Sequence, residues 1–490
     1  MTPSTRFRHS GAALAHSLSP AAWRSAFHIR PADAIFTTAI KVGIAATIVL
    51  VAGGLMGQPQ LAGMAALGAL TSAFGRYQPY RRLAFMMSIV GVGMIVTMAI
   101  GAFMGAAGVP MPAQIAVLAL LAGLASHIFM AFRISGPGAV ILVFAAAAGT
   151  GYTHSYAAMA LPILAMTIGV VVGWLAAMVP ALVTPLAPSR LAVARALAAV
   201  VALSQNDADP LRSAALAALR SARDSVTISA GTLGKRGSRA HRVQQEAEQL
   251  HRVIDAAEAT LALFDGGDES ARAAALAQLS EYEAELRKVR GIPAVAQPHA
   301  TADSASSAGS AGSSRGTVPQ GFLAGARVQL SSRASILQAL RMAAASALSG
   351  WAAVGLGLEH PLWASMGAIA ALQGMNYAVT VQRSIQRLVG NVVGAAIAVV
   401  ILSLSLGFWP SVALVIVFQV LAELLVLKNY TLTTIAVTPM ALIMTGLGSQ
   451  LGPDAALSRV ADTLIGVVIG TLVAALSISL ADRHHLPKKP

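Results

Sequence analysis

Hydrophobic residues along this chain gather in long apolar runs separated by short polar segments. A run of about 17–25 apolar residues is long enough to cross a bilayer as a helix. Some of the runs are short, notably the second and fifth of each set of six, and we expect these to be tilted, broken or sheltered by neighbouring helices. The pattern predicts an all-α membrane protein with about twelve transmembrane helices, near residues 34–56, 60–75, 83–107, 113–132, 136–151 and 157–184, then 336–357, 361–376, 385–408, 410–427, 431–449 and 457–481.

The stretch between the two sets of runs has a different character. Of the 20 acidic residues, 14 lie between Ser189 and Ser335. Apolar residues recur there at helical spacing, as in Leu250, Val253 and Ile254, which predicts a water-soluble bundle of helices. The predicted organisation is an N-terminal segment (1–33), a first transmembrane repeat (34–186), a cytoplasmic helical domain (187–290), a flexible Ala/Ser/Gly/Pro-rich linker (291–335), a second transmembrane repeat (336–482) and a tail (483–490).

Basic residues alternate between the two sides of the predicted membrane region. The loops near 57–60, 107–112, 152–156, 358–361 and 408–411 contain no Lys or Arg, whereas the loops on the other side contain most of the remaining arginines. Arg459, near the start of the last run, is the one exception. The positive-inside rule therefore places both termini and the insert in the cytoplasm.

The two sets of runs resemble each other at an offset of about 296–302 residues. Residues 64–67 (MAAL) match 366–369 (MGAI), and residues 168–173 (IGVVVG) match 465–470 (IGVVIG). Each set has an even number of runs and starts on the same side, so we predict two parallel repeats related by an axis along the membrane normal. Substrate paths in such proteins lie at the interface between repeats.

Composition excludes several other classes of protein. Charged residues make up 11% of the chain and hydrophobic residues 56%, and the net charge is +14. The basic residues punctuate the apolar runs and form no stripe with aromatics, so membrane topology explains them better than nucleic acid binding. The chain has no cysteine, and it carries no HExxH motif, no Ser/His/Asp signature and no acidic cluster with metal spacing. We therefore expect no enzymatic activity, no metal and no cofactor.

Ionisable residues inside the apolar runs are the first candidates for chemistry, because a charge in lipid is costly. Glu423 and His127 occupy matched positions in the two repeats, which suits proton coupling; each could instead be a polar residue that bonds a neighbouring helix. Asp462 follows Arg459 by one turn. The pair is either an ion pair at the start of a helix or a proton site beside an anion-binding arginine.

A second group of candidates could bind an anionic substrate. Arg383 and Arg387 lie one turn apart, where they serve either membrane topology alone or attraction of a carboxylate. The short run at 361–376 begins with a tryptophan, and polar groups and a tyrosine end it. That is typical of broken helices that line transport cavities, although aromatic anchoring at the membrane surface is an alternative reading. The residues concerned are Trp363, Gln373, Asn376 and Tyr377.

Three segments of the second repeat resemble a known family. Residues 360–364 (HPLWA), 382–394 (QRSIQRLVGNVVG) and 429–432 (NYTL) with Thr438-Pro439 are similar to the fusaric acid resistance (FUSC) family, whose arrangement of six spans, a cytoplasmic domain and six spans also matches. Asn391 replaces the usual threonine. The first repeat has QPQL at residues 58–61 and lacks the tryptophan.

The resemblance implies an inner-membrane exporter of aromatic or other small organic anions in bacteria, driven by the proton motive force. Such exporters work in the lipid bilayer, often with a membrane-fusion or periplasmic adaptor protein. Two alternatives remain open, namely a passive anion channel, as in more distant plant relatives, and a membrane scaffold that transports nothing. The sequence also leaves open whether the chain forms a homo-oligomer.

Overall fold

The computed structural model describes residues 3–29, 36–205, 208–231, 237–266, 268–288, 291–293, 295, 322–374, 376–447, 454–479 and 482. Every regular element in these residues is a helix, which confirms the predicted all-α class. The predicted linker residues 296–321 and the predicted tail 483–490 lie outside the described residues. Two compact units are present: Met1–Phe74 with Met86–Ala177 and Phe322–Pro490, and Gly75–Phe85 with Met178–Gly321.

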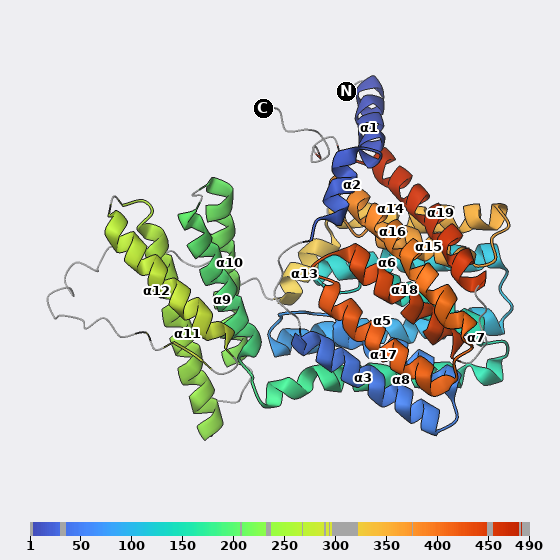
Figure 1. Cartoon of the computed structure of the whole chain (residues 1–490), viewed down its shortest axis with the longest axis horizontal. Helices are drawn as coiled ribbons and strands as arrows, with labels where there is room; N and C mark the ends of the chain where they lie inside the picture. The colour runs from blue at the N-terminus through green and yellow to red at the C-terminus, as the bar shows by residue number, and fades with distance from the viewer. Residues whose placement is uncertain are drawn as a thin grey trace. The chain divides into compact units, whose positions relative to one another are not determined.

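Helices lie over all twelve predicted apolar runs, and Figure 1 shows them gathered in one bundle. They are α3 (Phe36–Leu55), α4 (Pro59–Ala69), α5 (Tyr80–Ala106), α6 (Met111–Ala131), α7 (Val140–Tyr152) and α8 (Ala160–Met178), then α14 (Arg333–Gly355), α15 (Pro361–Ala371), α16 (Tyr377–Ser403), α17 (Phe408–Leu425), α18 (Tyr430–Gly446) and α19 (Asp454–Leu476).

Eight helices in the described part of the chain are long and apolar enough to cross a membrane, so the protein is a multi-span membrane protein. The eight differ from the predicted spans in two respects. They include Ala187–Ser204, which the sequence predicts to be cytoplasmic, and they omit five of the twelve predicted spans, namely α14 and the shorter helices α4, α7, α15 and α18. The total of twelve spans therefore stays a prediction.

The short helices are sheltered by protein, as expected. Helices α4 and α15 each have 11 residues, so at 1.5 Å per residue they are about 16 Å long, roughly half the thickness of a bilayer core. Each begins at a proline, which suits the first position of a helix because its missing N–H needs no partner there. Nearly every residue from Ala62 to Ala69 is buried, and so is every residue from Ala364 to Ala371. Neighbouring helices thus replace the lipid around both.

Glycines allow equivalent helix pairs to pack closely in the two sets. A Cβ atom at Gly169 of α8 would overlap the backbone of α4, and one at Gly466 of α19 would overlap the backbone of α15. In the same way Gly101 of α5 faces α7, and Gly390 of α16 faces α18. Small residues permit this approach where no hydrophobic effect drives helices together in lipid.

The two sets are also interlocked. The fourth helix of the first set, α6, packs on α14, the first helix of the second set; conversely α17 packs on α3. These exchanged contacts are equivalent under the predicted parallel repeat, which itself stays a prediction. They imply that the two halves share one extensive interface and do not form two separate bundles.

Replacing Gly466 with alanine should destabilise the membrane unit by about 1–3 kcal/mol, because the added Cβ meets backbone that cannot move aside. The measurement is the midpoint of thermal unfolding in detergent. The matched control is Gly355→Ala on α14, where a Cβ atom meets open space. That substitution should leave the midpoint unchanged or raise it. Equal effects of the two substitutions would show that the α15–α19 contact is not tight.

The second unit is a group of four helices: α9 (Ala187–Val201), α10 (Asp209–Ala230), α11 (Ser238–Ala262) and α12 (Glu269–Arg287). The apolar stripe predicted on α11 is buried, with Leu250, Val253 and Ile254 at 0% exposure. Arg223 of α10 pairs with Asp255 and Glu258 of α11 at 2.7 and 3.0 Å. Burial alone would lower the pKa of Arg223, but these two carboxylates outweigh it and raise that pKa.

Part of the predicted linker 291–335 is helical. Helix α13 (Phe322–Leu330) packs on α6, and α14 already begins at Arg333. This segment is helical because it packs against the membrane helices. The Ser- and Gly-rich composition of the residues before it does not indicate such a contact.

Candidate functional site

Two arginines of α16 contact the same tyrosine in the membrane unit, one at its ring and one at its hydroxyl. The guanidinium carbon of Arg383 lies 4.3 Å from the ring centroid of Tyr430, a cation–π distance. The Nη1 of Arg387 donates a hydrogen bond to the hydroxyl of Tyr430 at 3.3 Å, and the Nη2 of Arg383 donates to Oε1 of Gln373 at 3.2 Å. Three predicted substrate-site residues therefore meet around Tyr430, which was not predicted as a site residue.

A third arginine joins them from α19. Arg459 is 9% exposed, and its guanidinium carbon lies 4.4 Å from the ring centroid of Trp363 at the start of α15. The positive charges of Arg387 and Arg459 are close enough to repel each other. We call Arg383, Arg387 and Arg459 the arginine cluster.

The arginine cluster has unused hydrogen-bonding capacity. In each of its three arginines the Nε–H is buried and has no hydrogen-bond partner within the described part of the chain. A buried donor without an acceptor is costly, and native structures keep few of them. One neighbouring carboxylate, that of Asp462, is fully buried at 0% exposure and opposes the three positive charges. The cluster therefore carries more positive than negative charge.

Asn391 of α16 links the turn of helix that carries Arg387 to α18. Its Nδ2 donates to the carbonyl of Arg387 at 3.0 Å, and its Oδ1 accepts from the hydroxyl of Thr438 at 2.8 Å. Gly390 and Gly394 let α18 approach α16 on either side of this residue. The position at which the sequence departs from the family pattern is thus a polar link from α16 to α18.

The N-terminal helices cover the end of α16 next to the cluster. Helix α1 (Pro3–Ser17) is followed by α2 (Pro20–Phe27), whose last carbonyls are bound by three amide side chains. Gln382 donates to Ser25 O at 2.9 Å and Gln386 to Ala26 O at 2.8 Å, while Asn429 donates to both Ala26 O and His28 O. These amides alternate with Arg383, Arg387 and Tyr430 along the chain. The starts of α16 and α18 therefore carry both the contacts to α2 and the side chains of Arg383, Arg387 and Tyr430.

Replacing Gln386 with alanine should release α2 from this position. Losing one buried hydrogen bond costs about 1 kcal/mol, so trypsin should cleave after Arg24 about fivefold faster. The measurement is the cleavage rate of the full chain in detergent. Gln278→Ala, an exposed glutamine of the second unit, is the control. Equal rates for the two variants would mean that Gln386 does not hold α2.

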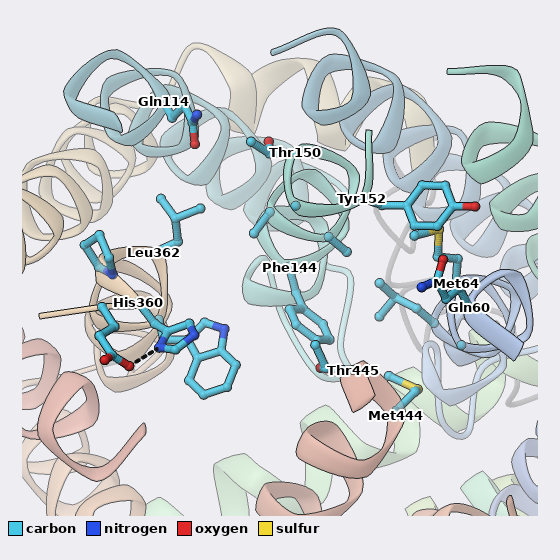
Figure 2. Close-up of a pocket in the computed structure, with 18 of the residues that line it drawn as sticks. Gln60, Met64, Gln114, Phe144, Thr150, Tyr152, His360, Leu362, Met444 and Thr445 are labelled. Carbon is cyan, nitrogen blue, oxygen red and sulfur yellow. Dashed lines mark ion pairs between the residues drawn. The ribbon is translucent and has the colours of Figure 1, made fainter. Parts of the chain in front are cut away.

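A cavity of about 690 Å³ lies at the opposite end of the membrane helices, among the loops that lack Lys and Arg. We call this end the neutral face and the other the basic face. Figure 2 shows the cavity between His360 and Leu362 on one side and Gln60, Met64 and Tyr152 on the other, with Phe144 between them. Among the described residues, no lysine or arginine lines it. Trp363 does line it, and the guanidinium of Arg459 packs on that same ring, so the cavity and the arginine cluster meet at Trp363.

His360 stands at the edge of this cavity with three polar or aromatic neighbours. Its ring is stacked on that of Trp363, with centroids 5.1 Å apart and planes inclined by 24°. The Nδ1 lies 3.0 Å from the hydroxyl of Ser458 and 4.0 Å from Oε2 of Glu359. The hydroxyl of Ser458 in turn donates to Oδ2 of Asp462 at 3.5 Å. Asp462 was predicted as a site residue, whereas His360 and Ser458 were not.

Two predicted proton-coupling residues lie apart from the cavity. Glu423 is 5% exposed on α17, the helix that packs on α3. His127 lies on α6, and its Nδ1 is 2.8 Å from the hydroxyl of Ser335 at the start of α14. Neither lines the cavity. Each instead belongs to one of the two exchanged helix pairs that interlock the halves.

Asn376 and Tyr377 occupy the start of α16 and make the contacts of a helix start. The Oδ1 of Asn376 accepts from the backbone N–H of Val379 at 2.9 Å, as an N-cap residue does. Tyr377 is 3% exposed, and its backbone N–H donates to Oδ2 of Asp482 at 2.8 Å. The structure thus places both at the end of the helix that holds Arg383, where they fix its first turn.

Comparison with known proteins finds one family match, in the second membrane half. Residues 344–473 match the model of the family described as fusaric acid resistance protein-like, which confirms the resemblance over that segment. The match contains the whole arginine cluster, Tyr430 and Asp462. The chain is also 30% identical over 140 residues to an uncharacterized membrane protein, YvaC, of Bacillus subtilis (strain 168); the match covers 28% of this chain and 22% of that protein. No solved structure matches.

Proposed function

We propose that this membrane protein, with its fusaric acid resistance-like second half, exports small organic anions such as aromatic carboxylic acids across the bacterial inner membrane. The observation that carries the proposal is the arginine cluster, because three buried Nε–H groups without acceptors offer a carboxylate what it needs. Tyr430 and Trp363 already pack on its guanidinium groups, which favours a flat aromatic substrate over an aliphatic one.

The proposed path runs from the basic face to the neutral face. By the positive-inside rule the basic face, both termini and the insert are cytoplasmic. An anion would be attracted to the arginines from the cytoplasm, pass Trp363 and leave through the cavity, whose lining carries no basic residue among those described. The cavity lies at the proposed release side, while α2 and its three amide contacts cover the start of α16 on the proposed entry side.

Proton coupling would use a buried carboxyl, and Asp462 is the best placed because it lies beside Arg459 and near the cavity. Glu423 and His127 are the alternatives from the matched positions. Glu423→Gln should leave transport driven by a pH gradient within about twofold of the original if Asp462 is the coupling residue, and should abolish it if Glu423 is. The scale for losing an essential acid or base is about 100-fold or more, so the two results are easily separated in proteoliposomes.

The test of the proposed function is flux of radiolabelled benzoate in proteoliposomes, driven by a pH gradient alone or by voltage alone. Accumulation under a pH gradient supports a proton-coupled exporter. Flux that follows voltage and ignores the pH gradient would mean a passive anion channel. Absence of flux under both conditions would favour a membrane scaffold. An adaptor protein in the periplasm would extend the exporter across the outer membrane, but the flux test does not need one.

A further inference from the structure

The cavity and the buried acid Asp462 are joined by a short row of polar groups. His360 lines the cavity and precedes the first residue of α15, so its ring lies at the neutral-face end of a helix that stops halfway through the membrane. Its Nδ1 is 3.0 Å from Ser458 Oγ on the first turns of α19. Ser458 Oγ is 3.5 Å from Oδ2 of Asp462, one turn farther into the unit.

Each member of the row has the chemistry to pass a proton. Imidazole can gain a proton at one nitrogen and lose one from the other, and a serine hydroxyl can accept and donate at the same time. Asp462 is 0% exposed, and its Oδ1 is buried without a hydrogen-bond partner in the described part of the chain. A buried carboxylate with one oxygen lacking a donor is incompletely stabilised, so a proton arriving through Ser458 has a receptive acceptor.

We propose that His360 and Ser458 form a proton relay through which the neutral-face cavity protonates the buried Asp462. The inference deepens the proposed function, on which its physiological meaning rests, by naming how the coupling proton enters. It makes His360 and Ser458 positioning and transfer residues for the proton. The substrate contacts are left to the arginine cluster.

The transfer balances at each step. The Nε2 of His360 takes a proton from a hydronium ion in the cavity, which leaves water. The Nδ1 proton passes to Ser458 Oγ while the proton of that hydroxyl passes to Oδ2 of Asp462. The products are a neutral imidazole with its proton on Nε2, an unchanged serine and a neutral carboxylic acid. Rotation of the ring, or exchange of its proton with cavity water, restores the first tautomer.

The charges around the relay are mixed. Glu359, whose side chain is 76% exposed, lies 4.0 Å from His360 Nδ1. The charges near Asp462 are the positive guanidinium of Arg459, one turn away on α19 with Arg387 of α16 beyond it, and the negative carboxylate of Glu359. Other ionisable groups on packed elements include His154, which lines the same cavity, Asp454 at the start of α19 and Arg341 of α14, whose Nη2 donates to Ser477 O near the other end of α19.

The experiment follows protonation of Asp462 directly. The purified full chain in detergent, with no organic acid present, is mixed with acid in a stopped-flow infrared cell, and the carboxylic acid C=O band that Asp462→Asn removes is recorded. The band should grow in the original protein. In Ser458→Ala it should reach the same amplitude about 10-fold or more slowly, on the scale of losing a positioned proton-transfer group. His360→Phe, which keeps a ring to stack on Trp363, should slow it similarly.

Two further variants complete the test. Ser403→Ala, the same substitution at the exposed end of α16, should leave the rate unchanged, and Ser458→Thr, which keeps the hydroxyl, should restore the original rate. Equal rates in Ser458→Ala, His360→Phe and Ser403→Ala would overturn the relay, and so would the absence of any band removed by Asp462→Asn. The infrared assay contains no substrate, so it tests the relay independently of benzoate export. Loss of the relay would leave the flux result intact, and loss of benzoate flux would leave the infrared result intact.

Discussion

Replacing Arg387 with alanine is expected to weaken binding of benzoate by about 10- to 100-fold, because a hydrogen bond to a charged group contributes about 1.5–3 kcal/mol. Arg387 is the central member of the arginine cluster: it holds the hydroxyl of Tyr430 and its charge faces that of Arg459. The measurement is equilibrium binding of radiolabelled benzoate to the purified protein.

Two controls show whether the loss belongs to the cluster. Arg387→Lys keeps the positive charge but loses the planar fork of donors, so its affinity should lie between those of the original protein and Arg387→Ala. Arg327→Ala removes an exposed arginine of α13, outside the cluster, and should bind benzoate as the original does. Unchanged affinity in Arg387→Ala would remove the arginine cluster from the proposed anion site.

Replacing Asp462 with asparagine should abolish benzoate flux driven by a pH gradient while benzoate binding persists or tightens. The substitution removes the buried group that takes the proton. It also removes the negative charge beside Arg459, which opposes an incoming anion. The loss of gradient-driven flux should reach about 100-fold or more, the scale of an essential acid or base.

The measurement pairs two assays on the same proteoliposomes: accumulation under a pH gradient and exchange of labelled for unlabelled benzoate without one. Exchange should continue in Asp462→Asn because it needs no net proton movement. Asp454→Asn, an exposed residue at the start of the same helix, should behave as the original in both assays. Gradient-driven accumulation that survives in Asp462→Asn would place the coupling group elsewhere.

The helices of the membrane unit were predictable because an apolar run is recognised from consecutive residues alone, without knowledge of how the helices pack. The short length of α4 and α15 was predictable too, and the structure supplies the reason it is tolerated, since their residues are buried in protein. The count of spans was less secure. Apolarity alone favours Ala187–Ser204 as a span and disfavours α14, whose apolar face is interrupted by arginine.

The candidate site shows where sequence reasoning ends. Arg383, Arg387 and Arg459 were each predicted from their placement at or near the start of an apolar run, but their meeting around Tyr430 and Trp363 depends on how α15, α16, α18 and α19 pack. His360 and Ser458 are 98 residues apart, and no local pattern joins them. For Asn376, the preference of asparagine for helix N-caps would have indicated its observed role. Glu423 and His127 were paired by their matched sequence positions. The structure places them in the two exchanged helix contacts and not at the cavity.

The location of a bound anion tests the central claim most directly, namely that the arginine cluster is the substrate site. A structure of the full chain with p-bromobenzoate would show the carboxylate among Arg383, Arg387 and Arg459, within hydrogen-bond distance of at least two of them, and the ring against Tyr430 or Trp363. Bromobenzoate bound only elsewhere, with the three Nε–H groups still without acceptors, would contradict the account.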